Sequence, residues 1–96
     1  MAGDAQRIDK WLWFCRFVKS RSLAQGLVED GCVRINRLKI DRSSHAVRPG
    51  DVVTFTLHGV VRVVRVLDAG ERRGPAAEAQ ALYEEIASPV GSRDTL

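Results

Sequence analysis

The stretch that decides the fold is "RIDKWLWFCRFVKSRSLAQGLVEDGCVRIN", residues 7–36 of a chain of 96 residues. Five apolar residues in its first half recur at helical spacing: Ile8, Trp11, Leu12, Cys15 and Val18. This spacing predicts a helix over residues 7–18. The alternation in "CVRIN" predicts a strand, because every second side chain of a strand points to the same side.

Between these elements, "LAQGLVEDG" predicts a second helix over residues 22–30, with Gly31 as the residue that ends it. Ser20 or Ser22 can serve as its N-cap, and Ser22 begins a capping-box pattern. Gly26 costs about 1 kcal/mol relative to alanine inside a helix. One explanation for this cost is a close approach of the first helix.

The rest of the chain predicts a small sheet and one more helix. Strands are expected over residues 52–57 and 60–67, joined by a tight hairpin at His58 and Gly59. The segment "RPGD" marks a turn before the first of these strands. The segment "AAEAQALYEEI", residues 76–86, is predicted to be helical.

These elements predict an α+β fold, with two N-terminal helices on a small, mostly antiparallel sheet and a C-terminal helix at its side. We expect a flexible N-terminus over residues 1–6, one domain over 7–69, and a helix and tail over 70–96. Nine residues are expected in the core: Ile8, Leu12, Cys15, Leu23, Leu27, Val33, Ile35, Val53 and Phe55.

Composition and charge limit the possible functions. Apolar residues make up 45% of the chain, which suffices for one modest core. The net charge is +3, but residues 7–48 carry ten Lys or Arg and only four Asp or Glu, a net +6. Charge segregated in this way indicates an anionic partner for the first half of the chain.

Several other classes of function find no support in the sequence. Cys15 and Cys32 lack the spacing of a metal site, so we expect reduced thiols, no metal and no cofactor. His45 and His58 have no catalytic partner at a diagnostic spacing, and we expect no enzymatic activity. The N-terminus lacks the pattern of a signal peptide, and the longest apolar run is too short to span a bilayer. We therefore expect a cytoplasmic protein without a membrane partner.

The segment "KSRS" places Lys19 and Arg21 at the start of the second helix, where the helix dipole favours acidic residues. A nucleic-acid phosphate bound there would make both cations favourable, and the unpaired backbone N–H groups would bind it as well. The alternative is a pair of solvated side chains whose stems pack on the surface.

The order of these motifs resembles the S4 RNA-binding domain. Its pattern is an Arg-hydrophobic-Asp opening, a Ser-Arg pair before the second helix, and Gly-x-Val-x-Val-Asn. The chain fills these places with Arg7-Ile8-Asp9, Ser20-Arg21 and the segment 31–36. "DKWLWFCRF" and "RRGPAAEAQALYEE" extend the resemblance to the heat shock protein 15 family, through about residue 86. Two departures are Asn36-Arg37 in place of the usual Asn-Gly turn and a missing long basic tail, which predicts a lower RNA affinity.

The segments "CVRIN" and "RLKI" predict a first hairpin, with a turn near Asn36 and Arg37. The resemblance implies that cations of the two helices and of this first hairpin converge on RNA, which fits better than DNA. Ten residues are the predicted RNA contacts: Arg7, Lys10, Arg16, Lys19, Ser20, Arg21, Arg34, Asn36, Arg37 and Lys39. An ordinary solvated face is the alternative for Arg7, Lys10 and Arg16. Trp13 and Phe17 can stack on bases or, more commonly, pack in the core, here under Leu82 and Tyr83.

The same resemblance implies a function on the ribosome. The expected partner is ribosomal RNA of the large subunit, and tRNA is a further candidate. The expected role is the rescue or recycling of stalled subunits that carry peptidyl-tRNA after stress, performed by a monomer. The alternatives are a general binder of structured RNA and a protein-interaction module without ribosome specificity.

Overall fold

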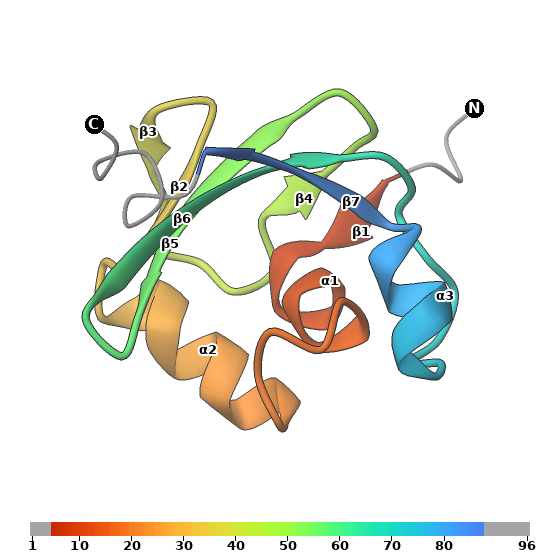
Figure 1. Cartoon of the computed structure of the whole chain (residues 1–96). Coiled ribbons are helices and arrows are strands. Elements are labelled where there is room, and N and C mark those ends of the chain that lie inside the picture. Colours follow the sequence, from red (N-terminus) through yellow and green to blue (C-terminus); the bar gives the residue numbers. More distant parts are fainter. Residues whose placement is uncertain (1–4, 88–96) are drawn as a thin grey trace.

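A computed structural model describes residues 5–87; residues 1–4 and 88–96 lie outside the described part, as do the predictions made for them. Within it, the chain forms β1(Gln6–Arg7), α1(Ile8–Phe14), α2(Arg21–Glu29), β2(Val33–Ile35), β3(Leu38–Lys39), β4(Ala46–Val47), β5(Val52–Leu57), β6(Val60–Val66), α3(Ala76–Gln80) and β7(Tyr83–Ala87). The helices lie on one side of the sheet (Figure 1). The α+β class with two N-terminal helices against a mostly antiparallel sheet is confirmed.

Helix α1 is shorter than predicted, because it ends at Phe14 rather than at residue 18. Arg16 adopts the left-handed conformation, with φ 66°. Its N–H donates to the carbonyl of Trp13 at 3.0 Å, and the N–H of Phe17 donates to the carbonyl of Leu12 at 3.2 Å. These two bonds form a Schellman motif, which usually has glycine at the left-handed position.

Helix α2 begins one residue earlier than predicted. Ser20, and not Ser22, is the N-cap, and its Oγ accepts a hydrogen bond from the N–H of Leu23 at 3.2 Å. At the other end, Gly31 has φ 80° and its N–H donates to the carbonyl of Val28, so the predicted glycine stop is confirmed.

Five strands form one antiparallel sheet in the order β3-β2-β5-β6-β7, and β1 pairs with β4 in a separate two-stranded ribbon. Two-residue turns join β2 to β3 and β5 to β6. Asn36 and Arg37 have φ 52° and 75°, and His58 and Gly59 have φ 53° and 77°. A pair of positive φ values is typical of the type I′ turn, whose twist matches that of the flanking strands.

The segment expected to be one helix over residues 76–86 is a short helix followed by a strand. Helix α3 ends at Gln80, and β7 adds to the edge of the sheet beside β6. Glu84 bonds Arg65 at 2.8 Å and Glu85 bonds Arg62 at 2.5 Å, so the acidic residues of β7 face cations of β6. The C-terminal segment therefore completes the same sheet.

The N-terminal ribbon also corrects a prediction. Gln6, expected in a flexible segment, pairs with Val47, and Arg7 pairs with Ala46. The N–H groups of Ile8 and Asp9 donate to the carbonyls of His45 and Ser43. The loop before β4 thus satisfies the first N–H groups of α1, which have no partner within the helix.

The core lies between the helices and the sheet. Of the nine predicted core residues, seven are buried: Ile8, Leu12, Cys15, Val33, Ile35, Val53 and Phe55. Leu27 is half-buried and packs against this core. The prediction for Leu23 is wrong, because its side chain is 54% exposed on the outer face of α2.

Phe17 belongs to the core through an aromatic cluster. Its ring centroid lies 4.8 Å from that of Phe55 and 4.6 Å from that of Tyr83, and the guanidinium of Arg62 lies 4.8 Å from it. Trp13 is half-buried and also packs against the core. The packing interpretation of both residues is therefore the one that the structure supports.

Candidate nucleic-acid interface

The centre of the candidate interface is Asp9, a fully buried carboxylate between the two helices. It accepts hydrogen bonds from Arg7 Nε at 3.1 Å and Nη2 at 3.0 Å, from the N–H of Lys10 at 2.7 Å and from Gln25 Nε2 at 3.1 Å. Arg21 Nη2 lies 3.4 Å from the same carboxylate. One acid thus holds two arginines that the sequence predicted as RNA contacts.

Two opposing effects act on the pKa of Asp9. Burial raises it, because a charged carboxylate loses its hydration, while hydrogen bonds from Arg7, Gln25 and the N–H of Lys10 lower it. The bonds outweigh burial, so the pKa of Asp9 lies below its usual range. The carboxylate is therefore ionised at neutral pH and orients both arginines.

This arrangement explains in part why "KSRS" carries two cations. The charge of Arg21 at the start of α2 is compensated by Asp9, and its side chain remains 36% exposed. Arg21 Nε is buried and has no hydrogen-bond partner in the described part of the chain. Lys19 is exposed and forms no ion pair with a described residue. An anion at this helix start can therefore interact with Lys19 and with the outer edge of Arg21.

The first hairpin places its four predicted contacts in different surroundings. Arg34 and Arg37 are exposed, and neither forms an ion pair with a residue of the described part. The amide of Asn36 donates to Asp51 at 3.1 Å and accepts from the N–H of Val52 at 2.9 Å. Asn36 therefore holds the turn before β5, and its side-chain amide is already engaged.

Lys39 does not join the residues at the start of α2. It lines a surface depression beside three acids at the other end of this helix: Glu29, Asp30 and Asp41. Nine helical residues span roughly 13 Å, so Lys39 and Lys19 lie about one helix length apart. The predicted cations therefore form two groups, one at the start of α2 and one on the hairpin, rather than a single cluster.

Arg16 has a structural bond as well as an exposed position. Its Nε donates to the carbonyl of Gly74 at 2.8 Å, which ties the end of α1 to the segment before α3. This bond offsets part of the cost of the left-handed backbone at Arg16, where any residue but glycine is strained.

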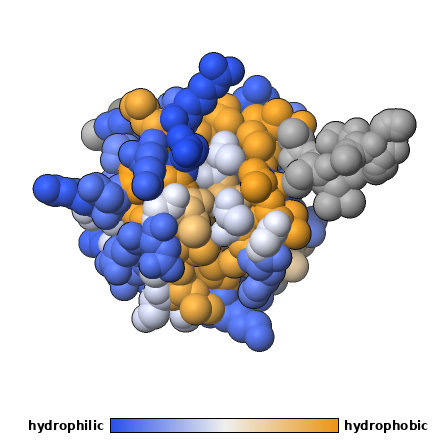
Figure 2. All heavy atoms as spheres, turned by 90° about the vertical axis from the view of Figure 1, so that its left-hand side faces the viewer, coloured by the Kyte–Doolittle hydropathy of each residue, from blue (hydrophilic) through white to orange (hydrophobic). Residues whose placement is uncertain are grey.

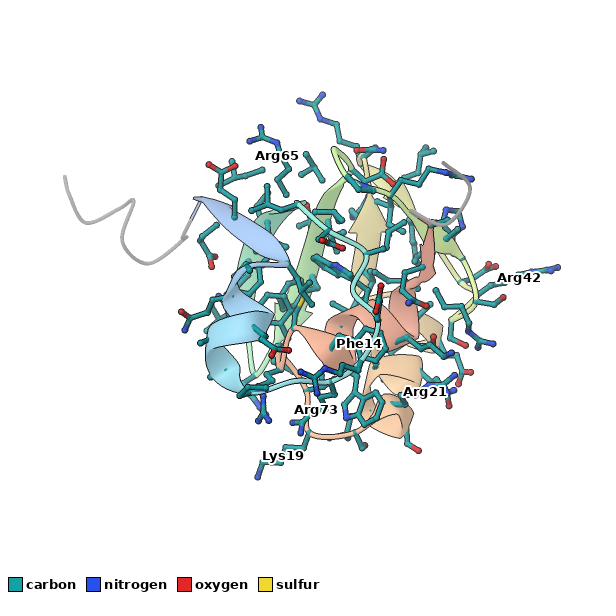
Figure 3. All side chains as sticks on the ribbon, turned by 90° about the vertical axis from the view of Figure 1, so that its right-hand side faces the viewer. Phe14, Lys19, Arg21, Arg42, Arg65 and Arg73 are labelled. Carbon is teal, nitrogen blue, oxygen red and sulfur yellow. The ribbon has the colours of Figure 1, made fainter. Side chains whose placement is uncertain are left out.

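Arg73 is a candidate contact that sequence reasoning missed. Its guanidinium lies 5.7 Å from the ring centroid of Trp13, and its Nε is buried without a described partner. Figure 3 shows Arg73 and Lys19 close together below α1, although 54 positions separate them in the sequence. The sequence did contain a sign that Arg73 is functional, because it lies in "RRGPAAEAQALYEE", one of the two stretches that resemble the heat shock protein 15 family.

Other chemistry finds no centre in the described residues 5–87. No group of three or more metal-ligating side chains occurs there. None of the described helices is long and apolar enough to cross a membrane. Burial raises the pKa of the Cys15 thiol, which keeps this cysteine in its neutral form.

A helical hairpin on an antiparallel sheet, with cations at the start of its second helix, defines an S4-type RNA-binding module. Residues 6–53 match the family model of the S4 domain. The heat shock protein 15 homolog of Haemophilus influenzae is 33% identical over 96 residues, which cover all of this chain and 72% of that protein. Heat shock protein 15 of Escherichia coli K12 is 39% identical over 94% of this chain and 67% of its own length.

A solved structure supports the same relationship. Heat shock protein 15 of Vibrio cholerae, solved as a trimer, superposes with a TM-score of 0.84 at 36% identity, covering 94% of this chain and 90% of that one. The chain belongs to the heat shock protein 15 family of S4-domain proteins.

Proposed function

We propose that this protein is a non-catalytic RNA-binding factor that docks on ribosomal RNA of the large subunit in the cytoplasm. Its role is the rescue or recycling of stalled subunits that carry peptidyl-tRNA after stress. The observation that carries the proposal is the preformed basic site at the start of α2, where buried Asp9 orients Arg7 and Arg21 near Lys19, which forms no ion pair within residues 5–87.

The geometry suits recognition of a folded RNA surface by shape. The site requires no rearrangement, because Asp9 already fixes the arginines. Ser20 Oγ accepts from Leu23, so its hydroxyl hydrogen remains available to a phosphate. Lys10, Arg34 and Arg37 extend the contact in this proposal. Binding energy alone can then hold one subunit conformation, and no bond needs to be broken.

Lys19 offers a direct test of the phosphate contact. Lys19→Ala should weaken RNA binding across different sequences, because phosphate contacts carry no sequence information. It should also reduce the log–log salt slope by roughly 0.7 to 0.9 for one lost contact. Arg65→Ala is the matched control, since it removes the same charge from a residue of β6 that is paired with Glu84. Equal slopes for Lys19→Ala and wild type would show that Lys19 touches no phosphate.

Arg21→Ala is less suitable alone, because Arg21 also contacts buried Asp9. Its effect on RNA binding should be read together with an unfolding curve of the same variant. A normal curve with weaker, less salt-dependent binding would assign Arg21 to the RNA.

Ribosome specificity needs a separate experiment. Affinities should be compared for purified large subunits with and without peptidyl-tRNA, for small subunits and for a generic duplex RNA. We expect the tightest binding to large subunits with peptidyl-tRNA. Equal affinity for all four would leave the alternative, a general binder of structured RNA. Sedimentation of the protein alone decides between a monomer, expected from the sequence, and a trimer like that of the Vibrio cholerae protein.

A further inference from the structure

A groove of about 630 Å³ lies beside the proposed RNA site. Its walls are the loop between α1 and α2, the outer face of α2, the β5–β6 turn and Arg73. Four of the residues that line it give it an apolar floor: Phe17, Leu23, Leu27 and Leu57. Figure 2 shows the side of the molecule that carries α2 and the β5–β6 turn, where apolar side chains gather between hydrophilic ones.

Gly26 marks this groove as more than a packing defect. A glycine inside a helix destabilises it relative to alanine, so its presence calls for a physical reason. The predicted reason, close approach of α1, is wrong, because no atom of α1 or of any other described element outside α2 lies within 4 Å of a Cβ added at Gly26. Every other glycine at positions 5–87 has either a positive φ or a neighbour that a Cβ would meet. The space over Gly26 opens into the groove.

The exposed leucine of α2 points to the same place. Leu23 has the amphipathic spacing of a core residue, yet its side chain is 54% exposed and lines the groove with Leu27, one turn further along. The absence of a side chain at Gly26 deepens the groove between these two leucines. An apolar, flat group could lie there in contact with the helix backbone.

The charge at the rim indicates what such a group would carry. Lys19, Arg16 and Arg73 line the groove, against a single acid, Asp30. Neither Lys19 nor Arg73 forms an ion pair with a described residue, and Arg73 Nε is buried without a partner. Lys19 also belongs to the proposed phosphate site at the start of α2, so groove and RNA site are continuous. An apolar floor beneath a cationic rim suits a ligand with a flat base and a phosphate.

We propose that this groove takes one unpaired nucleotide of the bound RNA, with its base over Gly26 and its phosphates on Lys19 and Arg73. The proposal rests on the proposed function and specifies the RNA that the site prefers, a helix with a bulged or flipped-out nucleotide. Unstacked bases are the parts of an RNA that proteins bind most specifically, whereas a regular duplex offers shape and phosphates.

Two hairpin RNAs test the proposal, one fully paired and one with a single bulged 2-aminopurine. We expect wild type to bind the bulged hairpin at least tenfold more tightly, and binding to change the 2-aminopurine fluorescence. Gly26→Leu fills the groove, and Leu23→Ser removes one wall without adding bulk. Both should lose the preference and the fluorescence change while binding the paired hairpin as wild type does. Gln80→Leu, on exposed α3 outside the groove, is the control and should keep both.

The outcomes separate this inference from the proposed function. Equal wild-type affinity for the two hairpins, or a preference that survives in Gly26→Leu, overturns the groove proposal and leaves RNA binding standing. If a protein segment, and not a nucleotide, occupied the groove, wild type would bind the two hairpins with equal affinity. Failure of both hairpins to bind, at a salt concentration at which large subunits bind, would overturn the groove proposal alone. Failure of large subunits to bind as well would overturn the proposed function.

Discussion

Asp9→Asn is the most informative single substitution, because it changes one buried atom and removes the charge that holds Arg7 and Arg21. The substituted amide would keep one acceptor oxygen, which can still take the N–H of Lys10 and Arg7 Nε. Its NH2 group would face Arg7 Nη2, Gln25 Nε2 and Arg21 Nη2, which are all donors.

The expected loss follows from these contacts. Hydrogen bonds to charged groups contribute about 1.5–3 kcal/mol each, and two such bonds within 3.2 Å are lost. Arg7 and Arg21 are 42% and 36% exposed, so both regain some hydration. We expect Asp9→Asn to lower the free energy of unfolding by about 3 kcal/mol, which lowers Tm by roughly 12–24 °C for a domain of this size. Urea unfolding followed by tryptophan fluorescence measures the loss, since Trp11 is fully buried in the same helix as Asp9.

The pH dependence gives an independent readout. Since the pKa of Asp9 is lowered on folding, the unfolded chain binds the proton more tightly. The contribution of Asp9 is therefore present above the unfolded value of 3.8 and is lost as the pH falls through the lower, folded value. Wild type should lose stability relative to Asp9→Asn below about pH 4. A loss under about 1 kcal/mol at pH 7, or the same acid dependence in both proteins, would refute the central role of Asp9.

Two further substitutions test the strained turns. Arg37→Gly should raise the free energy of unfolding by roughly 0.5–1 kcal/mol, because glycine adopts the φ of 75° without the left-handed penalty. The greater freedom of glycine in the unfolded chain offsets part of this gain. Urea unfolding measures the change, and a less stable variant would contradict the turn assignment. Arg16→Ala should lower the free energy of unfolding by about 1 kcal/mol, because it loses the bond to Gly74 and keeps the backbone strain. Arg16→Gly also loses the bond but relieves the strain, so its stability should be closer to that of wild type. Equal losses in both variants would show that backbone strain at Arg16 is unimportant.

Sequence patterns predicted those features that depend on local chemistry. The buried stripe of α1, the glycine that ends α2 and the hairpin at His58 and Gly59 each follow from residues that are neighbours in the chain. The end of α1 was missed, because the left-handed position holds Arg16 instead of the glycine that signals such an end. The strand β7 was missed because "LYEEI" favours a helix locally, and pairing with β6 decides its conformation.

The candidate site likewise combines features that the sequence predicts with features that only tertiary contacts decide. The sequence indicated cations at the start of α2 and implied the hairpin, but ion pairing is set by tertiary contacts. Asp9 is the shared partner of Arg7 and Arg21, and no pattern along the chain predicts its complete burial. Arg73 approaches Lys19 from the opposite end of the chain, so only the fold could bring it to the site. The RNA contacts themselves stay predictions.

The bonds between the first helix and the C-terminal segment affect how this chain folds during its own synthesis. Trp11 Nε1 donates to the carbonyl of Asp68, and Arg16 Nε to that of Gly74. Strand β6 pairs with β5 on one side and lacks its other neighbour until β7 has been made. The end of α1 therefore reaches its final packing only after residue 74 has left the exit tunnel, and the sheet beside β6 is completed only with β7. A domain that depends on such long-range contacts stays incompletely folded during translation, and its candidate RNA interface forms only after most of the chain has emerged.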